Sequence, residues 1–458
     1  MIGNIVMDLR EFFNTNRTKD LNFRLKQLKS LKQTIKHYEP EIFKALKEDL
    51  RKSDFEIVTT ELGLIFQELD CAIKNLKKWV KTERVSTPVY LKPSNGYILK
   101  EPYGVVLIIT PFNYPFQLSF VPLIGAIAAG NCAVVKPSKR TPRCAEVICK
   151  IIAQTFSSNY VRCVLPSELT SAEILSEDFD YIFFTGSTQT GKLIAETAAK
   201  KLIPYTLELG GKSPVIVDKN VNIEQAARKI AWGKFLNAGQ TCVAPDYVLV
   251  HEDVKQDLID NLIKSIKSFY GVFIQESKDY GRIIDTEGFR RLKEIIIQES
   301  KNIIYGGDYH ECGLYIEPTL LEIGSFDSPS MQEEIFGPIL PIMTYNNIDD
   351  VINSLKEKPK PLALYVFSKD KEFYWKIINS LSFGGGAVNE TVQQTAVHGL
   401  PFGGVGFSGV GKYHGKYTFD TFTHLKSVLV KNSDFDMDIM YPPYSYDTVK
   451  NVRKFLVK

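Results

Sequence analysis

The stretch YIFFTGSTQTGKLIAETAAKKL, residues 181–202, decides the fold class. Its apolar opening, YIFFTG, is typical of a buried strand, and the segment after the glycine-containing turn has the composition of a helix. Three more short apolar runs precede it, with helical segments between them: GVVLIIT (104–110), CAVVKP (132–137) and VRCVLP (161–166). Buried strands that alternate with helices predict an α/β fold with a parallel, doubly wound sheet.

The flanking segments extend this pattern in both directions. A second α/β series begins near YTLELGGKSPVIV, residues 205–217, and continues through YVLVHE. The first 80 residues predict helices, because leucine and isoleucine recur there at helical spacing, and we expect the Lys/Glu-rich opposite faces to be solvated. The stretch VYLKPSNGYILK, 89–100, predicts a hairpin around Ser-Asn-Gly, and HLKSVLVK, 424–431, predicts a further strand.

Composition narrows the class of protein. A chain of 458 residues is expected to form two or three domains. A net charge of only +3 argues against nucleic acid or an anionic membrane as partner. The chain has seven cysteines, an odd number, and no C-x-x-C motif. We therefore expect neither a disulfide framework nor a zinc or other metal site, and we expect the protein to lie in a reducing compartment.

No segment predicts membrane insertion or export. The N-terminus meets acidic residues before any long apolar core, which argues against a signal peptide. The most apolar long stretch, FVPLIGAIAAGNCAVV, is interrupted by Pro122 and Gly130 and predicts a buried helix and a strand. The C-terminal tail is too polar for an anchor. We therefore expect a cytoplasmic protein.

The turn at 183–193, FFTGSTQTGKL, aims backbone N–H groups and a positive helix end at a phosphate. It nearly matches the P-loop pattern through Gly186, Gly191 and Lys192, but Leu193 replaces the hydroxyl residue that holds magnesium. This disfavours a nucleotide triphosphatase and leaves a dinucleotide pyrophosphate or a plain strand–helix turn. GVGFSG, 404–409, fits G-x-G-x-x-G by letter but lacks a strand before it and a helix after it, so we interpret it as a loop.

Three side chains are candidates for chemistry. Cys242 follows small and amide residues in NAGQTCVAP, and local N–H groups or a helix end could lower its thiol pKa toward that of a nucleophile. Glu208, in TLELGG, lies between apolar residues, where burial raises a carboxyl pKa as a general base requires. Asn113, after a strand end, has a side-chain amide suited to an oxyanion. Each also has a structural alternative: inert packing, a satisfied strand glutamate and a turn cap.

Together these motifs resemble those of the aldehyde dehydrogenase superfamily, and more closely its class 3 branch. The resemblance covers about residues 50–430 and rests on TPFNYPF, VVKPSK, FFTGSTQTGK, LELGGKSP, GQTCVAPDY, EEIFGPILP and LPFGGVGFSGVGKYHGKYTFDTF, in the order of the family. It implies oxidation of an aldehyde to its acid with NAD or NADP, by a homodimer. It also implies a Rossmann-like cofactor domain, an α/β catalytic domain and a small β oligomerisation arm.

The resemblance assigns the catalytic roles. Cys242 would be the nucleophile and Glu208 the general base for water. The Asn113 amide would hold the oxyanion together with the Cys242 backbone N–H. Tyr114 and Phe402 would line the apolar entrance for the aldehyde.

It also assigns the cofactor contacts and the domains. The residues that would contact NAD or NADP are Lys136, Gly186, Ser187, Gly191, Glu334 and Phe336. Residues 1–84 and 101–207 would form the cofactor domain, and residues 208–413 the catalytic domain. Residues 85–100 and 414–458 would form the oligomerisation arm and tail.

One position departs from the family pattern. Many relatives carry an acidic residue after KPS, which bonds the adenosine ribose, whereas this chain has Lys139 and Arg140. Positive charge suits a 2′-phosphate, so we expect NADP to be accepted. The alternatives to this reading are an acylating enzyme that passes the acyl group to coenzyme A, a P-loop nucleotidase and an inactive scaffold. The presence of Glu208 favours hydrolysis.

Overall fold

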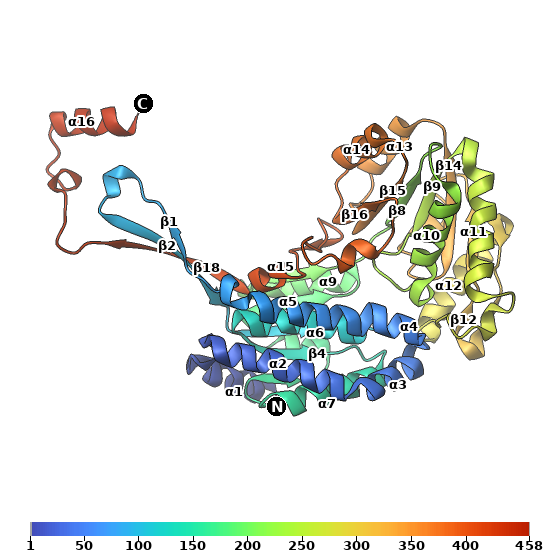
Figure 1. Ribbon diagram of the computed structural model, residues 1–458, viewed down its shortest axis with the longest axis horizontal. Helices are drawn as coiled ribbons and strands as arrows, with labels where there is room; N and C mark the ends of the chain where they lie inside the picture. Colours follow the sequence, from blue (N-terminus) through green and yellow to red (C-terminus); the bar gives the residue numbers. More distant parts are fainter. Residues whose placement is uncertain (1, 458) are drawn as a thin grey trace. The chain divides into compact units, whose positions relative to one another are not determined.

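The computed structural model describes residues 2–457, without the side chains of residues 2–4, 171 and 455. The chain forms two compact units (Figure 1). The body comprises residues 1–79 and 102–423, and the arm comprises residues 80–101 and 424–458.

The first sheet of the body has six strands. Their order is β17 (Gly409–Val410), β7 (Tyr205–Glu208), β6 (Tyr181–Thr185), β3 (Val105–Ile109), β4 (Cys132–Lys136) and β5 (Val161–Cys163). All neighbours are parallel except β17, which runs antiparallel to β7. Every residue of β3, β4 and β6 is buried, as expected for central strands covered on both faces. The predicted α/β parallel sheet is therefore confirmed.

Helices cover this sheet. They are α1 (Ile2–Asn14), α2 (Leu21–His37), α3 (Glu39–Leu50), α4 (Asp54–Glu56), α5 (Gly63–Trp79), α6 (Pro115–Ala129), α7 (Pro142–Thr155), α8 (Ser171–Leu175), α9 (Thr188–Lys201) and α15 (Lys416–Thr421). The helices α2, α5 and α6 pack against one another (Figure 1). Helix α6 is buried along its whole length, which explains its uniformly apolar sequence. Among residues 2–457, no helix is both long and apolar enough to span a bilayer.

The second sheet of the body has seven strands. Their order is β10 (Ile303–Tyr305), β13 (Thr319–Glu322), β14 (Ile339–Tyr345), β9 (Tyr247–His251), β8 (Pro214–Val217), β15 (Ala363–Phe367) and β16 (Gly385–Val388). All pairs are parallel except β10 with β13. The helices of this half are α10 (Ile223–Phe235), α11 (Lys255–Tyr270), α12 (Thr286–Gln298), α13 (Ile348–Lys356) and α14 (Lys371–Ser380), and a small pair joins β11 (Tyr309–His310) to β12 (Tyr315–Ile316).

The register of the first sheet brings candidate residues to one edge. Ile109 pairs with Lys136 on one side and Phe184 on the other, and Thr185 pairs with Glu208. The carboxyl ends of parallel strands therefore align here, which is where open α/β sheets bind ligands.

The charged faces of the N-terminal helices differ from the expectation. We predicted solvated Lys/Glu faces, but Lys52, Glu56, Glu61 and Glu68 are all buried. The Lys52 ammonium donates to the Glu61 carboxylate at 2.8 Å, with both side chains fully buried. The periodicity of apolar residues was informative about the helices, but it did not reveal this pairing of buried charges.

One disulfide corrects the cysteine analysis. Cys149, in α7, is bonded to Cys163, in β5, because α7 packs directly against that strand. Their Cα atoms are 5.1 Å apart, within the range that a disulfide spans. The other five cysteines are free thiols. We expected no disulfide framework, and the structure contains this single disulfide.

The arm contains a three-stranded sheet, β1 (Glu83–Val85), β2 (Ser94–Pro102) and β18 (Thr423–Lys431), and a terminal helix, α16 (Tyr446–Leu456). The predicted strand at 424–431 is confirmed as β18. The predicted hairpin is displaced, because Ser94, Asn95 and Gly96 lie inside β2 rather than at its turn. Gly96 pairs with Val85 across the antiparallel ladder, so the connection between the strands runs through residues 86–93 instead.

Candidate active site

The segment before Cys242 has an unusual backbone. Helix α10 ends at Phe235, and Asn237, Ala238 and Gly239 then adopt positive φ angles of 51°, 53° and 77°. Two consecutive non-glycine residues in the left-handed region are uncommon and need support from their surroundings. This turn reverses the chain and places Cys242 at the wall of a cavity.

Gln240 supplies part of that support. Its side-chain amide donates to the carbonyls of Asn237 at 3.1 Å and Arg282 at 2.9 Å. Its side-chain oxygen accepts from the Ile284 N–H at 3.0 Å. The glutamine of the GQTC motif therefore fixes the loop from behind.

The thiol of Cys242 is half-buried, and its pKa is raised to about 12. Burial is the main cause, followed by the negative charges of Glu334 and Glu208, while the N–H groups of Cys242 and Val243 act in the opposite direction. The local N–H groups therefore lower this pKa, as expected, but burial and the neighbouring carboxylates outweigh them. The resting sulfur is a protonated thiol.

Glu208 ends β7 beside the same cavity, and its side chain is almost fully buried. Among the described residues, neither of its carboxyl oxygens has a hydrogen-bond partner. Burial raises its pKa well above 4.5. A satisfied strand glutamate, which was the structural alternative, is therefore not what the structure contains.

Asn113 lies beyond the end of β3 and is buried against the cysteine loop. Its side-chain amide donates to the Gln240 carbonyl at 3.1 Å. Its own carbonyl accepts from the Lys52 ammonium at 2.8 Å and from the Asn237 side-chain amide at 2.9 Å. The amide donor thus lies next to the segment that carries Cys242.

The cavity that contains Cys242 and Glu208, which we call the cysteine cavity, has a volume of about 530 Å³. Tyr114 and Phe402 both line it, and the Tyr114 hydroxyl is 2.6 Å from the Thr241 hydroxyl. The Phe402 ring stacks on His414 with centroids 5.1 Å apart.

Most of the remaining wall of the cysteine cavity is apolar or carries neutral hydroxyl and amide groups. The lining residues that were not singled out from the sequence include His414 and the fully buried Tyr413. Both lie in the quoted KYHGKY stretch, whose aromatic content was the available signal.

The residues proposed to contact the cofactor line up after β4 and β6. Lys136 ends β4 with its side chain mostly buried. Ser187 is the N-cap of α9 and accepts from the Thr190 N–H. Gly186 and Gly191 have packing roles of their own, because a Cβ would collide with the Phe184 ring at the first and with Leu209 at the second.

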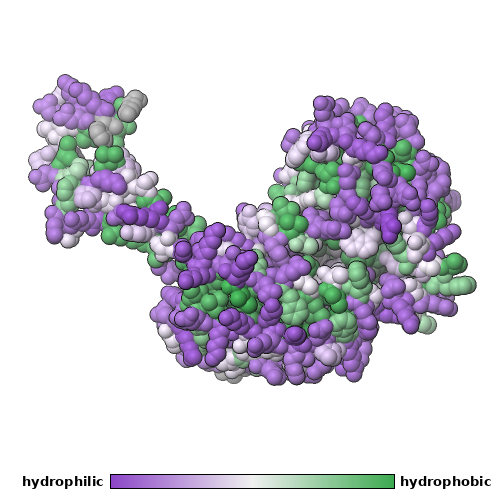
Figure 2. Space-filling view, in the orientation of Figure 1, coloured by the Kyte–Doolittle hydropathy of each residue, from purple (hydrophilic) through white to green (hydrophobic). Residues whose placement is uncertain are grey.

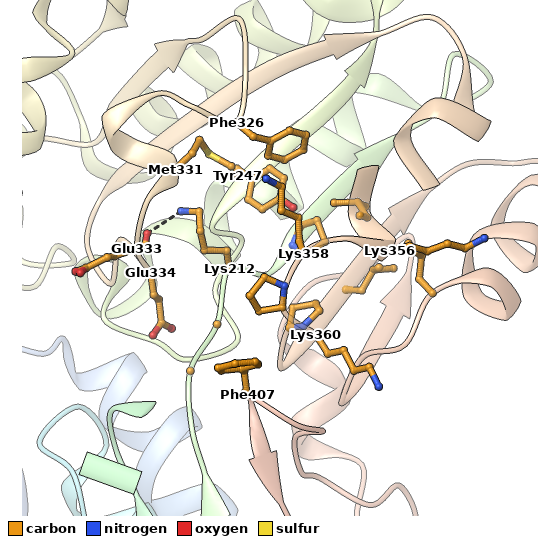
Figure 3. Close-up of a pocket in the computed structure, with 18 of the residues that line it drawn as sticks. Lys212, Tyr247, Phe326, Met331, Glu333, Glu334, Lys356, Lys358, Lys360 and Phe407 are labelled. Carbon is orange, nitrogen blue, oxygen red and sulfur yellow. Dashed lines mark hydrogen bonds between the residues drawn. The ribbon is translucent and has the colours of Figure 1, made fainter. Parts of the chain in front are cut away.

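Glu334 and Phe336 lie in the loop before β14. The Glu334 side chain is directed toward Gly210, where a Cβ would collide with its carboxylate (Figure 3). Its pKa is raised to about 8, chiefly by burial. The Phe336 ring packs edge-on against Phe112, with centroids 5.8 Å apart.

The loop that carries Glu334 is held by Lys212, which follows the LELGG motif. The Lys212 ammonium donates to the carbonyl of Glu333 at 2.8 Å (Figure 3). It also pairs with Asp246 at 2.5 Å. The same Asp246 accepts from the Ile335 N–H at 3.0 Å. These contacts tie the segments after β7, after Cys242 and before β14 into one unit.

Arg140 differs from the sequence expectation. Its guanidinium forms a two-point ion pair with Asp285, at 2.5 and 2.7 Å, and lies over the Phe112 ring. Its charge is therefore already compensated within the protein. Lys139 remains exposed next to Lys136, whose pKa is lowered by burial and by the Lys139 charge.

Residues 4–428 match the family model described as the aldehyde dehydrogenase family. The chain belongs to the aldehyde dehydrogenase family. The predicted resemblance is thereby confirmed. The protein is an NAD(P)-dependent oxidoreductase that converts an aldehyde to its acid, as its relatives do.

Two curated relatives indicate the branch of the aldehyde dehydrogenases. The 4,4'-diaponeurosporen-aldehyde dehydrogenase of Staphylococcus aureus is 53% identical over 437 residues, which cover 95% of each chain. The rat enzyme named aldehyde dehydrogenase, dimeric NADP-preferring, is 42% identical over 444 residues, covering 96% of this chain and 98% of the rat chain.

Two solved structures agree with the fold. Substrate-bound AldH of Staphylococcus aureus superposes with a TM-score of 0.96 at 51% identity, covering 99% of both chains. The NAD+ complex of the Bacillus cereus aldehyde dehydrogenase gives a TM-score of 0.85 at 26% identity, covering 93% of this chain and 88% of that one.

The residues at the sheet edge fit a nicotinamide dinucleotide. Lys136 offers an ammonium at the carboxyl end of β4. The N-terminus of α9, a helix of 14 residues, follows β6 in the same sheet and presents backbone N–H groups at the same edge. Lys136 and the α9 N-terminus thus suit ribose and phosphate groups. Glu334, in the loop before β14, suits a ribose hydroxyl.

Proposed function

We propose that Cys242 is the nucleophile, that Glu208 is the general base and that Asn113 is the oxyanion donor of this aldehyde dehydrogenase. The observation that carries the proposal is that Cys242 and an unpartnered, buried Glu208 line the same apolar cavity. Asn113 supports it through its hydrogen bond to Gln240, two residues before the cysteine. Tyr114 and Phe402 provide the apolar walls for the aldehyde.

The chemistry proceeds in two stages on the sulfur. Cys242 gives its proton to solvent water, and the thiolate attacks the aldehyde carbon, which forms a tetrahedral thiohemiacetal with an oxyanion. The Asn113 side-chain amide and the Cys242 backbone N–H donate to that oxygen. Lys136 and Glu334 would hold NAD(P)+, which would supply the acceptor for the hydride that leaves the tetrahedral carbon. A thioester remains on Cys242, and water that gives its proton to Glu208 hydrolyses it to the acid.

The main alternative is an acylating enzyme, in which coenzyme A takes the acyl group. A carboxylate at position 208 is needed only to activate water for hydrolysis of the thioester. The position of Glu208 beside the cysteine cavity therefore favours hydrolysis over transfer to coenzyme A. The deciding experiment incubates the enzyme with aldehyde and NADP, with and without coenzyme A, and quantifies free acid and acyl-coenzyme A by mass spectrometry. Free acid in both incubations supports the proposal, and turnover that requires coenzyme A overturns it.

The proposed substrate is an apolar aldehyde with a long or extended chain. The cysteine cavity is lined mainly by apolar side chains, and exposed Phe55 lies at its wall. The Staphylococcus aureus relative is named for a carotenoid aldehyde, which is consistent with this choice. A panel of aldehydes that differ in chain length and charge, followed by nicotinamide absorbance, ranks the classes directly.

We expect NADP to be accepted through Lys139. Because Arg140 is paired with Asp285, the exposed Lys139 ammonium is the charge available to a 2′-phosphate. Lys139→Glu is expected to lower kcat/KM for NADP relative to NAD by about 10- to 100-fold, the effect of losing one charge-assisted contact. Lys139→Met is the neutral control and should fall between. A large preference for NAD that Lys139→Glu leaves unchanged would contradict this prediction.

The domain division and the cellular location are part of the proposal. The first sheet supports a cofactor domain of residues 1–84 and 101–207, and the second sheet supports a catalytic domain of residues 208–413. The proposed oligomerisation arm and tail comprise residues 85–100 and 414–458, although residues 414–423 belong to the body in the structure. A cytoplasmic location has support from five free thiols, and the Cys149–Cys163 bond argues in the other direction. Fractionation of cells distinguishes a cytoplasmic location from one outside the cytoplasm.

A homodimer is expected because β18 is an edge strand that needs a partner. It carries exposed apolar side chains, Leu425, Val428, Leu429 and Val430, and Figure 2 shows hydrophobic side chains at the surface of the arm. Such edges are usually paired, and the rat relative is named dimeric. Leu429→Lys is expected to shift sedimentation at micromolar concentration from dimer to monomer. Val272→Lys, at a more exposed apolar site on the body, should not. A monomeric wild-type protein would contradict the prediction.

A further inference from the structure

A buried cluster of charges lies behind the cysteine cavity and takes no part in the steps above. It consists of Lys52, Glu56 and Glu61, which we call the Lys52 cluster. A buried lysine loses its hydration and is retained only where its partners compensate for that loss. The contacts of this lysine therefore indicate what it does.

Lys52 has two oxygen partners and one aromatic neighbour. Its ammonium donates to the Glu61 carboxylate and to the Asn113 carbonyl, both at 2.8 Å. It also lies 3.9 Å from the centroid of the Tyr114 ring. Glu61 in turn accepts from the Gln117 N–H at 2.8 Å with its second oxygen, in the first turn of α6. The cluster thus fixes the chain from Asn113 to the start of α6.

The same cluster reaches the nucleophile loop. Glu56 accepts from the Asn237 N–H at 3.2 Å, and the Asn237 side-chain amide donates to the Asn113 carbonyl that Lys52 also contacts. Asn237 is the first of the left-handed residues that turn the chain toward Cys242. One carbonyl, that of Asn113, therefore holds both segments in register.

We propose that Lys52, paired with Glu61, is a positioning residue that sets the Asn113 amide and the Cys242 loop at the separation that the oxyanion requires. It acts through Asn113 and touches neither substrate nor cofactor. The inference rests on the proposed role of Asn113 as the oxyanion donor. An oxyanion donor is effective only within a narrow range of distance to the developing charge, so a displaced Asn113 loses rate without losing the side chain.

The test uses Lys52→Met/Glu61→Gln, which removes both charges while the glutamine keeps an oxygen for the Gln117 N–H. The burst of NAD(P)H in the first turnover is measured by stopped flow. We expect the burst rate constant to fall by about 10- to 100-fold, less than the roughly 10²- to 10³-fold expected for Asn113→Ala. The KM for aldehyde and the Kd for NADP should stay within about twofold.

The decisive measurement is non-additivity. In an Asn113→Ala background, Lys52→Met/Glu61→Gln should cost no further rate, because residues that act as a unit are not additive. A merely structural role would slow both backgrounds equally. Lys47→Met, which removes the exposed pair with Asp54 at 2.5 Å, is the matched control and should leave the burst unchanged.

Two results would overturn the inference. One is a burst rate constant in Lys52→Met/Glu61→Gln equal to that of the wild type. The other is a further fall in the burst rate constant, of the same factor, when these substitutions are added to Asn113→Ala. If the double variant does not fold, Asn237→Gly gives the same test, because glycine accepts the positive φ and lacks the amide. Asn237→Gly should slow the burst about 10-fold in the wild-type background and should cause no further slowing in the Asn113→Ala background. If Asn113→Ala itself is harmless, the proposed oxyanion role falls and this inference with it, whereas the role of Cys242 is tested separately.

Discussion

Replacing Cys242 by serine is expected to reduce aldehyde oxidation by on the order of 10⁴-fold or more, the scale of losing a covalent nucleophile. Serine fits the same space, so the loop that Gln240 holds should be unchanged. Its hydroxyl is a far weaker nucleophile than a thiolate, and no base is hydrogen-bonded to it in this cavity. The variant should still bind NADP, which separates loss of chemistry from loss of folding.

A trapping experiment identifies the sulfur directly. Wild-type protein is quenched during turnover of an aldehyde with NADP, and the acylated peptide is located by mass spectrometry. The label is expected on the peptide that contains Cys242 and should be absent in Cys242→Ser. Cys312→Ser, which changes an exposed free thiol, is the control and should keep both label and activity. A label on another side chain, or acid formed without any label, would refute the role of Cys242.

The pKa of this thiol also implies a pH profile. Because burial and two neighbouring carboxylates raise it to about 12, the thiolate is a small fraction of the resting protein near neutral pH. That fraction rises with pH, so the burst rate should rise as well. The nicotinamide ring of NAD(P)+ carries a positive charge, and Glu334 is proposed to hold the cofactor, so binding should favour the thiolate and iodoacetamide should modify Cys242 faster with cofactor present. Equal rates with and without cofactor would contradict this electrostatic account.

The central strands of the first sheet could be predicted because their burial is complete. The apolar runs at β3, β4 and β6 have no polar face, and only a sheet covered on both sides explains that pattern. The arm hairpin was misplaced for the opposite reason. Ser94, Asn95 and Gly96 have the composition of a turn, but Ser94 is buried and Gly96 pairs with Val85, so tertiary packing overrides local preference.

Candidate site residues could be selected where one short motif carries them, and not where charges distant in the sequence meet. Cys242 and Glu208 were candidates from their own surroundings, each with a structural alternative, and the resemblance to the family supplied their proposed roles. The partner of Arg140, by contrast, is 145 residues away, and no local pattern indicates that Asp285 neutralises it. The Lys52 cluster could not be predicted for the same reason, because lysine and glutamate in an amphipathic helical pattern normally face water. Their burial depends on how α6 and the cysteine loop pack.

Replacing Glu208 by glutamine is expected to separate the two stages of the reaction. The burst of NAD(P)H should stay within about tenfold of wild type, because the attack by Cys242 does not require this carboxylate. Release of acid should slow by about 10²- to 10⁴-fold, the usual contribution of a general base. The thioester should then accumulate, which the trapping experiment measures as a larger acylated fraction.

The pH dependence gives the sharper half of this prediction. A general base acts only when ionised, and burial raises the Glu208 pKa well above its usual 4.5. The rate of acid release in the wild type should therefore rise with pH far above the range where an exposed glutamate titrates. In Glu208→Gln this rise should flatten. Glu390→Gln, which alters a carboxylate paired with Lys229 and outside the cysteine cavity, is the control and should keep the wild-type profile. If Glu208→Gln slows the burst and acid release equally, Glu208 is needed before the thioester forms and is not the hydrolytic base.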